Sequence, residues 1–378
     1  MLRSYKYRLD PTRSQAVALN GMLGAFCDLY NAGLQQRIEA YQRQRKSLRY
    51  VDQANELKAV RLADDRLAGY SYSAEQQILR RLDKAFAAFF RRLKTKAKAG
   101  FPRFRAKSWF DSAEFRVGDG LTVRNSKRIG IVGIPAEIKV KWHRPLPADA
   151  KLGAAVISRS CAKWFVCFQI ELPDAEPVDR SFAPVGIDMG LTSIVALSTG
   201  ERVETPQYVS KAAKRVRRLQ RAVARRRRHS ERQRKAKRAV ARRHSRVANQ
   251  RRDFSHKLSR RLVDRFSPIA MEDLNIVGLA RGMLAKSVHN AAWAQLVQHV
   301  RYKAESAGVE VRLVDPRRTS QTCPECGTIT PKTLAQREHR CDCGCVLDRD
   351  VAAARVVLHL AGFRPGTGLQ AQSVRDAA

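Results

Sequence analysis

The alternation of apolar and polar residues divides the chain into segments of different character. Residues 4–9 alternate polar and apolar side chains, which predicts a strand, and Asp10-Pro11 ends it. From Thr12 apolar residues recur at three- and four-residue spacing, which predicts helices as far as about residue 99. Residues 110–175 change to short apolar runs separated by Gly and Pro turns, which is typical of a small β-barrel. We expect the first strand to join this barrel, so that the helical bundle is an insertion.

A buried-type strand at residues 183–187 delivers one carboxylate, Asp188, to its end. Two glycines flank Asp188, and a second apolar run follows at residues 193–197 after a tight turn. The first hairpin of an RNase H-like sheet places a metal-binding Asp in this way. Burying an unpaired carboxylate is costly, so a bound partner is favoured. The same motif also fits an ordinary turn Asp, and the residues downstream have to decide between these interpretations.

The net charge is the property of the composition that says most about the protein's partners. The 378 residues contain 73 Lys and Arg against 35 Asp and Glu, which gives a net charge of +38. Such a surface favours a polyanionic partner, and nucleic acid fits better than a membrane. The sequence shows no apolar run of transmembrane length and no signal-peptide core at its N-terminus, so we expect a cytoplasmic protein without a membrane partner.

Two basic segments are candidates for nucleic-acid contact. Residues 211–261 contain only two acids and a thin apolar stripe, which predicts two long helices that fold back near residues 229–233. Arg226, Arg227 and Arg228 at this tip are either phosphate contacts or a solvated turn. Residues 100–105 interleave aromatic residues with Arg103 and Arg105, a combination suited to stacking bases and pairing phosphates. The alternative is a connector whose phenylalanines pack in the core.

Two further carboxylates follow the same logic as Asp188. A short apolar run at residues 269–271 delivers Glu272 to a second strand end. A helix is predicted over about residues 287–307, and it leads to a strand at residues 309–314. Asp350 then opens a helix, where a carboxylate is electrostatically favourable in its own right. Three such carboxylates repel one another unless divalent ions neutralise them, so the set predicts a site for two Mg²⁺ ions that hydrolyse a phosphodiester.

The cysteines predict a zinc site. Cys323 and Cys326 are two residues apart in a turn, and Cys341, Cys343 and Cys345 follow fifteen residues later. Two thiolate pairs at this separation are typical of a zinc ribbon. The second pair is irregular, because its spacing offers either Cys343 or Cys345 as the fourth ligand. We choose Cys343, since it precedes a glycine as Cys326 does.

These motifs in this order resemble the TnpB proteins of insertion sequences, relatives of the type V CRISPR nucleases. The resemblance is carried by GIDMG, AMEDLNI, DPRRTSQTCPECG and CGCVLDRDVAAA, and by YKYRLDP, FCDLYN and GFPRFR in the first part of the chain. It covers nearly the whole chain as far as about Gly362. It implies a RuvC-type nuclease, loaded with a guide RNA from the transposon end, that cleaves double-stranded DNA beside a short adjacent motif. By motif position, the catalytic metal ligands are Asp188, Glu272 and Asp350.

Together, the patterns and the resemblance predict an α+β multidomain protein, with a monomer favoured. A wedge-like β-barrel covers residues 1–10 and 105–180, and a helical recognition bundle covers residues 11–104. An RNase H-like (RuvC) α/β nuclease domain covers residues 181–319 and 347–362, with a zinc ribbon inserted at residues 320–346. A disordered tail covers residues 363–378. Arg317 completes the predicted nucleic-acid contacts, which otherwise lie at residues 103, 105 and 226–228.

One residue departs from the family pattern. TnpB proteins commonly have Asn two residues after the last catalytic Asp, and this chain has Ala352 there. An Asn at this position orients a carboxylate or caps the turn, so we expect reduced but not absent cleavage. The alternatives are a cleavage-deficient, RNA-guided DNA-binding repressor, or an RNA-binding regulator of transposition. The intact set of three carboxylates argues against both.

Overall fold

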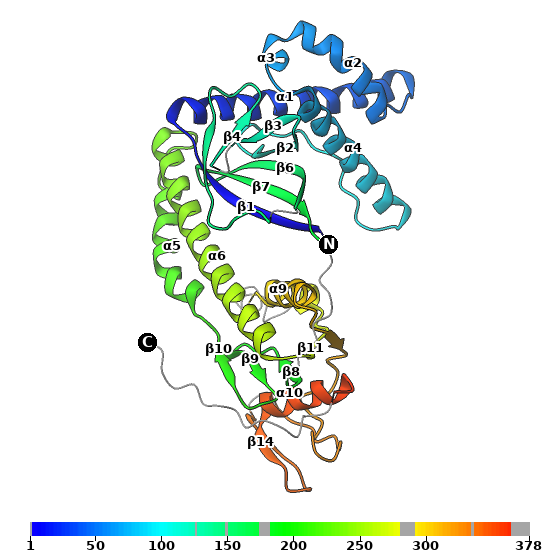
Figure 1. The fold of residues 1–378 in the computed structure, drawn as a ribbon, viewed down its shortest axis with the longest axis vertical. Coiled ribbons are helices and arrows are strands. Elements are labelled where there is room, and N and C mark those ends of the chain that lie inside the picture. Colours follow the sequence, from blue (N-terminus) through cyan, green and yellow to red (C-terminus); the bar gives the residue numbers. More distant parts are fainter. Residues whose placement is uncertain are drawn as a thin grey trace. The chain divides into compact units, whose positions relative to one another are not determined.

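The computed structural model of the chain forms two compact units, Met1–Pro173 and Asp174–Ala378 (Figure 1). It describes residues 2–124, 127–147, 150–173, 182–279, 292–333 and 336–363. Each unit has its own hydrophobic core. The predicted tail, except for Phe363, and the predicted start of a helix near residue 287 lie outside the described residues.

The first unit contains a closed seven-stranded barrel in the order β1-β5-β4-β3-β2-β6-β7. Strand β1 (Leu2–Asp10) closes it by pairing with both β5 (Ile138–Lys141) and β7 (Lys163–Glu171). The other strands are β2 (Ser112–Val117), β3 (Gly120–Arg124), β4 (Arg128–Ile131) and β6 (Lys151–Ser160). The prediction that the strand before the helices joins the barrel is therefore confirmed.

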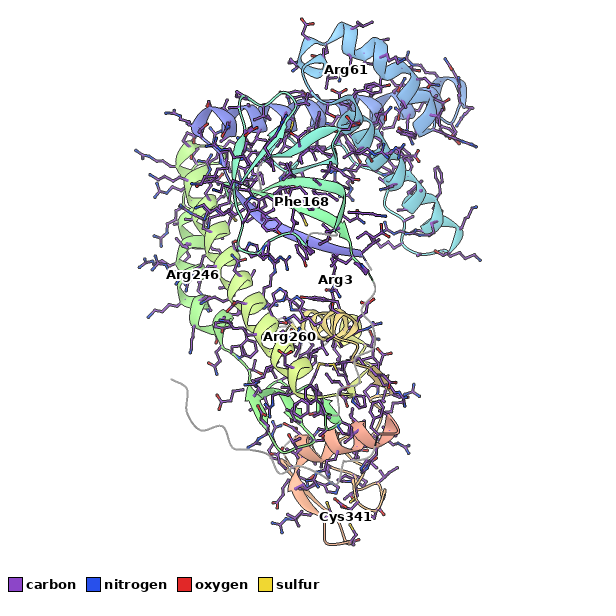
Figure 2. All side chains as sticks on the ribbon, in the orientation of Figure 1. Arg3, Arg61, Phe168, Arg246, Arg260 and Cys341 are labelled. Atoms are coloured by element: carbon purple, nitrogen blue, oxygen red, sulfur yellow. The ribbon has the colours of Figure 1, made fainter. Side chains whose placement is uncertain are left out.

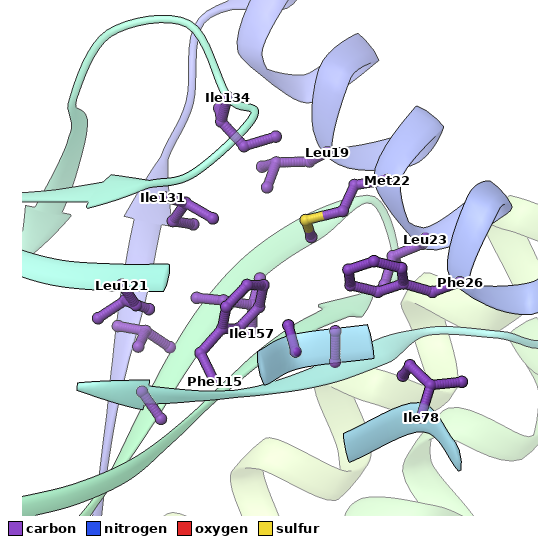
Figure 3. Close-up of a cluster of buried hydrophobic side chains, with 14 of the residues drawn as sticks. Leu19, Met22, Leu23, Phe26, Ile78, Phe115, Leu121, Ile131, Ile134 and Ile157 are labelled. Carbon is purple, nitrogen blue, oxygen red and sulfur yellow. The ribbon is translucent and has the colours of Figure 1, made fainter. Parts of the chain in front are cut away.

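Four helices are inserted between β1 and β2 of the barrel. They are α1 (Arg13–Gln44), α2 (Tyr50–Ala63), α3 (Asp65–Ala68) and α4 (Tyr72–Lys94). A capping box at Thr12 starts α1, because the Thr12 hydroxyl and the Gln15 side chain bond to each other's backbone amides. Apolar residues of α1, among them Met22 and Phe26, pack against Phe115 and Leu121 of the barrel (Figure 3). The insertion and the barrel thus share one core.

The second unit is built on a five-stranded sheet in the order β10-β9-β8-β11-β12. Strands β8 (Val185–Asp188), β9 (Ser193–Leu197) and β10 (Arg202–Glu204) form an antiparallel meander. Strands β11 (Ile269–Glu272) and β12 (Val311–Val314) run parallel to β8. Nearly all residues of the three central strands are buried, which explains their continuous apolar sequences.

The remaining elements of this unit are helical or belong to the cysteine-rich segment. Helices α5 (Tyr208–Ala224) and α6 (Glu231–Arg265) form the predicted helical hairpin. Helices α7 (Ile276–Leu279), α9 (Trp293–Ser306) and α10 (Arg349–Leu360) complete the described helices, and β13 (Glu338–Arg340) pairs with β14 (Val346–Asp348). None of the helices in the described part of the chain is long and apolar enough to cross a membrane.

A glycine sets the distance between α10 and the sheet. A Cβ atom built at Gly186 in β8 would lie 2.0 Å from the carbonyl oxygen of Ala354 and 2.8 Å from the amide nitrogen of Leu358, both in α10. Real Cβ atoms essentially never come closer than 3.0 Å to such atoms. Only glycine therefore allows this backbone contact, which holds the middle of α10 close against β8.

Candidate active site and metal centre

The fold brings the three predicted carboxylates to one place. Asp188 and Glu272 end β8 and β11, and these strands are parallel neighbours with Ile187 paired to Met271. The carboxyl ends of parallel neighbours lie at the same edge of a sheet. Asp350 lies in the first turn of α10, which packs on β8. A Cβ atom at Gly190, in the turn after Asp188, would lie 3.8 Å from Oδ2 of Asp350.

The electrostatics of this carboxylate site, Asp188, Glu272 and Asp350, show mutual repulsion. Burial raises the pKa of Asp188 well above its usual range, and the charges of Glu272 and Asp350 raise it further. Arg349 opposes the shift. Burial also raises the pKa of Glu272, whose side chain is buried. A cluster that is costly to ionise without a counter-charge is suited to divalent cations, whose preferred ligands are carboxylate oxygens.

Hydrogen bonds fix the orientation of this site. The buried Thr319 hydroxyl donates to Oε1 of Glu272 at 2.7 Å and lies 3.1 Å from the carbonyl oxygen of Pro316. The indole of Trp293, the first residue of α9, donates to the carbonyl of Gly190 at 3.2 Å. Sequence reasoning missed both partners. Thr319 lies within the DPRRTSQ motif, so the family resemblance contained a signal for it, whereas nothing in the sequence marked Trp293.

The Asp348 side chain caps α10 and thereby orders the turn that carries Asp350. Its Oδ1 accepts from the backbone amides of Asp350 at 3.0 Å and Val351 at 3.3 Å. Ala352 is buried in the following part of the helix. Asp348 thus caps the turn although residue 352 is Ala. The capping role that the family's Asn was expected to supply is therefore filled here by another residue.

The cysteine-rich segment brings four thiols together. The sulfur atoms of Cys323, Cys326, Cys341 and Cys343 all lie within 4.8 Å of one another. The sulfur atoms of Cys323 and Cys343 are 3.6 Å apart, and those of Cys326 and Cys341 are 3.5 Å apart. Zn–S bonds of about 2.3 Å in a tetrahedron separate the sulfur atoms by about 3.8 Å, so this arrangement fits a Zn²⁺ ion.

A second, smaller group shares Cys323. The buried His339 and Cys345 each offer a ligand atom, and these atoms and the Cys323 sulfur lie within 4.8 Å of one another. The histidine was not among the predicted residues, and its place on β13 could not be read from the cysteine spacing. The second group keeps Cys345 in contact with the cluster as an alternative ligand.

The predicted nucleic-acid contacts are exposed. Arg226, Arg227 and Arg228 form the turn between α5 and α6. Figure 2 shows long basic side chains projecting from α6, including those of Arg246 and Arg260. Residues 103 and 105 lie in the first unit and are also exposed, whereas Arg317 lies beside Asp315 with 4.0 Å between the charged groups. These residues form separate sets, and the structure does not bring them into a single patch within one unit.

Three family models match parts of the chain. The OrfB_IS605 model, described as "Probable transposase", matches residues 167–283, and the Cas12f1-like TNB domain model matches residues 293–357. A helix-turn-helix domain model matches residues 1–46. In this structure those residues form strand β1 and one continuous helix, α1.

Whole-length relatives decide the family. A protein of Streptomyces pristinaespiralis, named "Putative RNA-guided DNA endonuclease", is 35% identical over 98% of this chain and 92% of its own length. The chain belongs to the TnpB family. A second relative, "Putative RNA-guided DNA endonuclease InsQ" of Escherichia coli K12, is 29% identical to this TnpB chain over 94% of it and 92% of the relative.

Solved structures show the same fold at low sequence identity. The Cas12f1 chain of a complex with guide RNA and target DNA has a TM-score of 0.58 and 14% identity, covering 91% of this TnpB chain and 82% of its own. The RNA-guided endonuclease Cas_phi3 has a TM-score of 0.50 and 9% identity, covering 98% and 94%. These likenesses support the multidomain architecture with a closed barrel that the sequence predicted.

Proposed function

We propose that this protein cuts double-stranded DNA at the carboxylate site, guided by an RNA from the end of its transposon. The chain is an RNA-guided DNA endonuclease, because its whole-length relatives in the family are named as RNA-guided DNA endonucleases. The single observation that carries the catalytic assignment is the convergence of Asp188, Glu272 and Asp350 at one end of the second unit's sheet. The short DNA motif beside the target, and a monomeric state, belong to the same proposal.

The second unit is an RNase H-like (RuvC) nuclease domain in this proposal. Its sheet order supports the assignment, since a three-stranded antiparallel meander is followed by two strands parallel to the first. Asp188, Glu272 and Asp350 would hold two Mg²⁺ ions, which when bound supply an activated water and stabilise the leaving oxygen of a phosphodiester. The Thr319 hydroxyl donates to one Glu272 oxygen and keeps that carboxylate in place. The Trp293 indole ties the turn after Asp188 to the start of α9.

The proposed domains follow the sequence boundaries. The barrel acts as the wedge and the inserted helices as the recognition bundle, while residues 320–346 form a zinc ribbon. In the ribbon Cys323, Cys326, Cys341 and Cys343 hold the Zn²⁺ ion, with Cys345 as the alternative fourth ligand. Hydrogen bonding between the Cys326 sulfur and Thr328 lowers the pKa of this thiol to about 6, and this favours the thiolate that binds a metal.

The basic surfaces would hold the nucleic acids. A net charge of +38 is explained if the chain carries a long RNA and a target duplex at once. Arg226, Arg227 and Arg228 at the helical tip, Arg103 and Arg105 in the first unit, and Arg317 near the ribbon are the proposed phosphate contacts.

The test uses protein co-expressed with the DNA that flanks its gene and purified with the RNA that it retains. This complex is given a plasmid library in Mg²⁺, in which a guide-matched target stands beside randomised bases. We expect cuts beside one short motif with the wild-type chain and none with Asp350→Ala. Retained RNA and motif-specific binding without any cut would refute the nuclease and identify the repressor.

A further inference from the structure

The segment of residues 101–109 presents aromatic side chains to solvent. Trp109 is 80% exposed, Phe104 is 54% exposed and Phe101 is about half exposed. Of the two alternatives for this segment, a connector whose phenylalanines pack in the core therefore does not hold for Phe104. Phe101 does both, because its ring contacts Phe86 and Phe89 edge to face while half of it stays accessible. Large aromatic side chains left in water indicate a binding surface.

Contacts with α1 hold the backbone of this segment in place. The Asn31 side chain accepts from the amide of Arg105 at 2.8 Å and donates to its carbonyl at 2.9 Å. The Cys27 thiol donates to the same carbonyl at 3.1 Å, and Lys107 pairs with Asp28 at 2.7 Å. The two motifs FCDLYN and GFPRFR, which are far apart in sequence, thus form one structural unit. A surface ordered in advance loses less conformational entropy when a partner binds.

The charge of the segment selects the kind of partner. No acidic residue occurs between Lys98 and Phe110. Within the described residues, the structure gives the side chains of Arg103 and Arg105 no ion-pair partner. Exposed aromatic rings alternating with unpaired guanidinium groups match a strand of unpaired nucleotides, whose bases offer stacking faces and whose phosphates offer charge. In a duplex the bases are already stacked on each other.

We propose that residues 101–109 form a stacking platform for single-stranded RNA, in which Phe104 and Trp109 stack on bases and Arg103 and Arg105 contact phosphates. The choice of RNA rests on the proposed function, since a guide RNA is carried permanently and target DNA binds transiently. A permanent partner covers rings that would otherwise stay in water throughout the life of the protein.

Tryptophan fluorescence gives a direct test with the full chain. Trp164 and Trp293 are only 4% and 6% exposed and Trp142 is partly buried against the barrel core, so Trp109, at 80% exposed, is the tryptophan most accessible to acrylamide. The chain is freed of nucleic acid in high salt and titrated with the RNA that it retained on purification. We expect this RNA to protect Trp109 from acrylamide, and the protection to be absent in Trp109→Phe, whose remaining tryptophans are less accessible.

Binding measurements on matched variants separate stacking from charge. Trp109→Ala and Phe104→Ala should each weaken RNA binding by about 10- to 100-fold, and Trp109→Phe should restore most of the affinity. The alanine variants should keep the salt dependence, whereas Arg103→Ala should lower its slope by about one. Leu62→Ala is the control, because Leu62 is an 88% exposed apolar residue on α2, outside the platform.

Three results would overturn the platform. Trp109 could remain equally quenchable with RNA bound, Trp109→Ala could bind RNA as tightly as Leu62→Ala, or single-stranded DNA of the same sequence could protect Trp109 equally well. Any of these results, obtained while DNA cleavage is intact, would refute the proposed platform and leave the proposed nuclease function standing. Protection of Trp109 by RNA in a protein that cleaves no DNA would support the platform and refute the proposed nuclease function.

Discussion

Replacing Gly186 by Ala should separate the carboxylates while leaving their side chains unchanged. The added Cβ would lie 2.0 Å from the Ala354 carbonyl oxygen, whereas contacts closer than 3.0 Å essentially never occur. Helix α10 must therefore move away from β8 by about 1 Å or more. Since Asp350 lies in the first turn of this helix, its carboxylate moves with the helix relative to Asp188.

The expected loss follows from this displacement. A misplacement of about 1 Å in a catalytic arrangement can cost on the order of 100-fold in rate. Overpacking costs about 1–3 kcal/mol, and for a unit of about 200 residues a loss of about 2 kcal/mol lowers Tm by about 4–8 °C. We expect Gly186→Ala to cut a guide-matched plasmid about 100-fold more slowly, with a Tm lower by several degrees.

The assay pairs single-turnover plasmid cleavage with thermal unfolding of the same preparation. Gly153→Ala is the matched control, because a Cβ there has its nearest neighbour, the Gln169 carbonyl oxygen, at an ordinary 3.7 Å. Wild-type cleavage and an unchanged Tm in Gly186→Ala would refute the inferred contact. A lower Tm with the full cleavage rate below that Tm would refute its role in placing Asp350.

Three further predictions concern the second unit. Thr319→Val removes the donor to the buried Glu272 carboxylate, so the Mg²⁺ concentration for half-maximal cleavage should rise about 10-fold, and Thr319→Ser should restore it. Cys326→Ser removes a thiolate, so zinc bound per chain, measured by mass spectrometry of the metal, should fall well below one. His299, buried and hydrogen-bonded to Ser255 at 2.9 Å, has its pKa lowered to about 4, first by burial. Because the unfolded chain takes up this proton at about pH 6.5, the stability that neutral His299 contributes is complete above that pH and is lost as pH falls toward 4. His299→Gln should therefore show a weaker fall of Tm between pH 6.5 and 4.

Each of these predictions has a result that contradicts it. An unchanged Mg²⁺ requirement in Thr319→Val would show that the hydroxyl does not orient Glu272. One zinc per chain in Cys326→Ser would transfer the ligand role to Cys345 or His339. Equal slopes of Tm against pH in the wild type and His299→Gln would show that other groups control acid stability.

The sequence predicted those parts of the site that depend on local pattern. Asp188 and Glu272 were found because strands buried on both faces are continuously apolar, so that a carboxylate at their ends stands out. The barrel strands and the helical hairpin were likewise predicted from local periodicity. The ends of elements were harder to predict: a helix is expected over about residues 287–307, and α9 covers Trp293–Ser306.

Contacts between distant residues were beyond sequence reasoning. Nothing local to Thr319 says that its hydroxyl meets Glu272, and nothing local to Gly186 says that α10 crosses it. The same holds for His339, which reaches the cysteines only because β13 pairs with β14. The exposure of Phe104 could not be predicted either, since the hydrogen bonds that hold the backbone of Arg105 come from Asn31, far away in sequence. Tertiary packing, rather than propensity, determines these features.

The position of α10 in the chain orders events during synthesis. Domains generally fold as units, starting from the N-terminus, as the chain leaves the ribosome. The barrel with its inserted helices lies wholly in the first unit, whereas the proposed set of metal ligands is complete only when Asp350 has been made. On these proposals, the platform at residues 101–109 is made and folded before the carboxylate site is complete. A newly made chain could then bind RNA before it is able to cleave DNA.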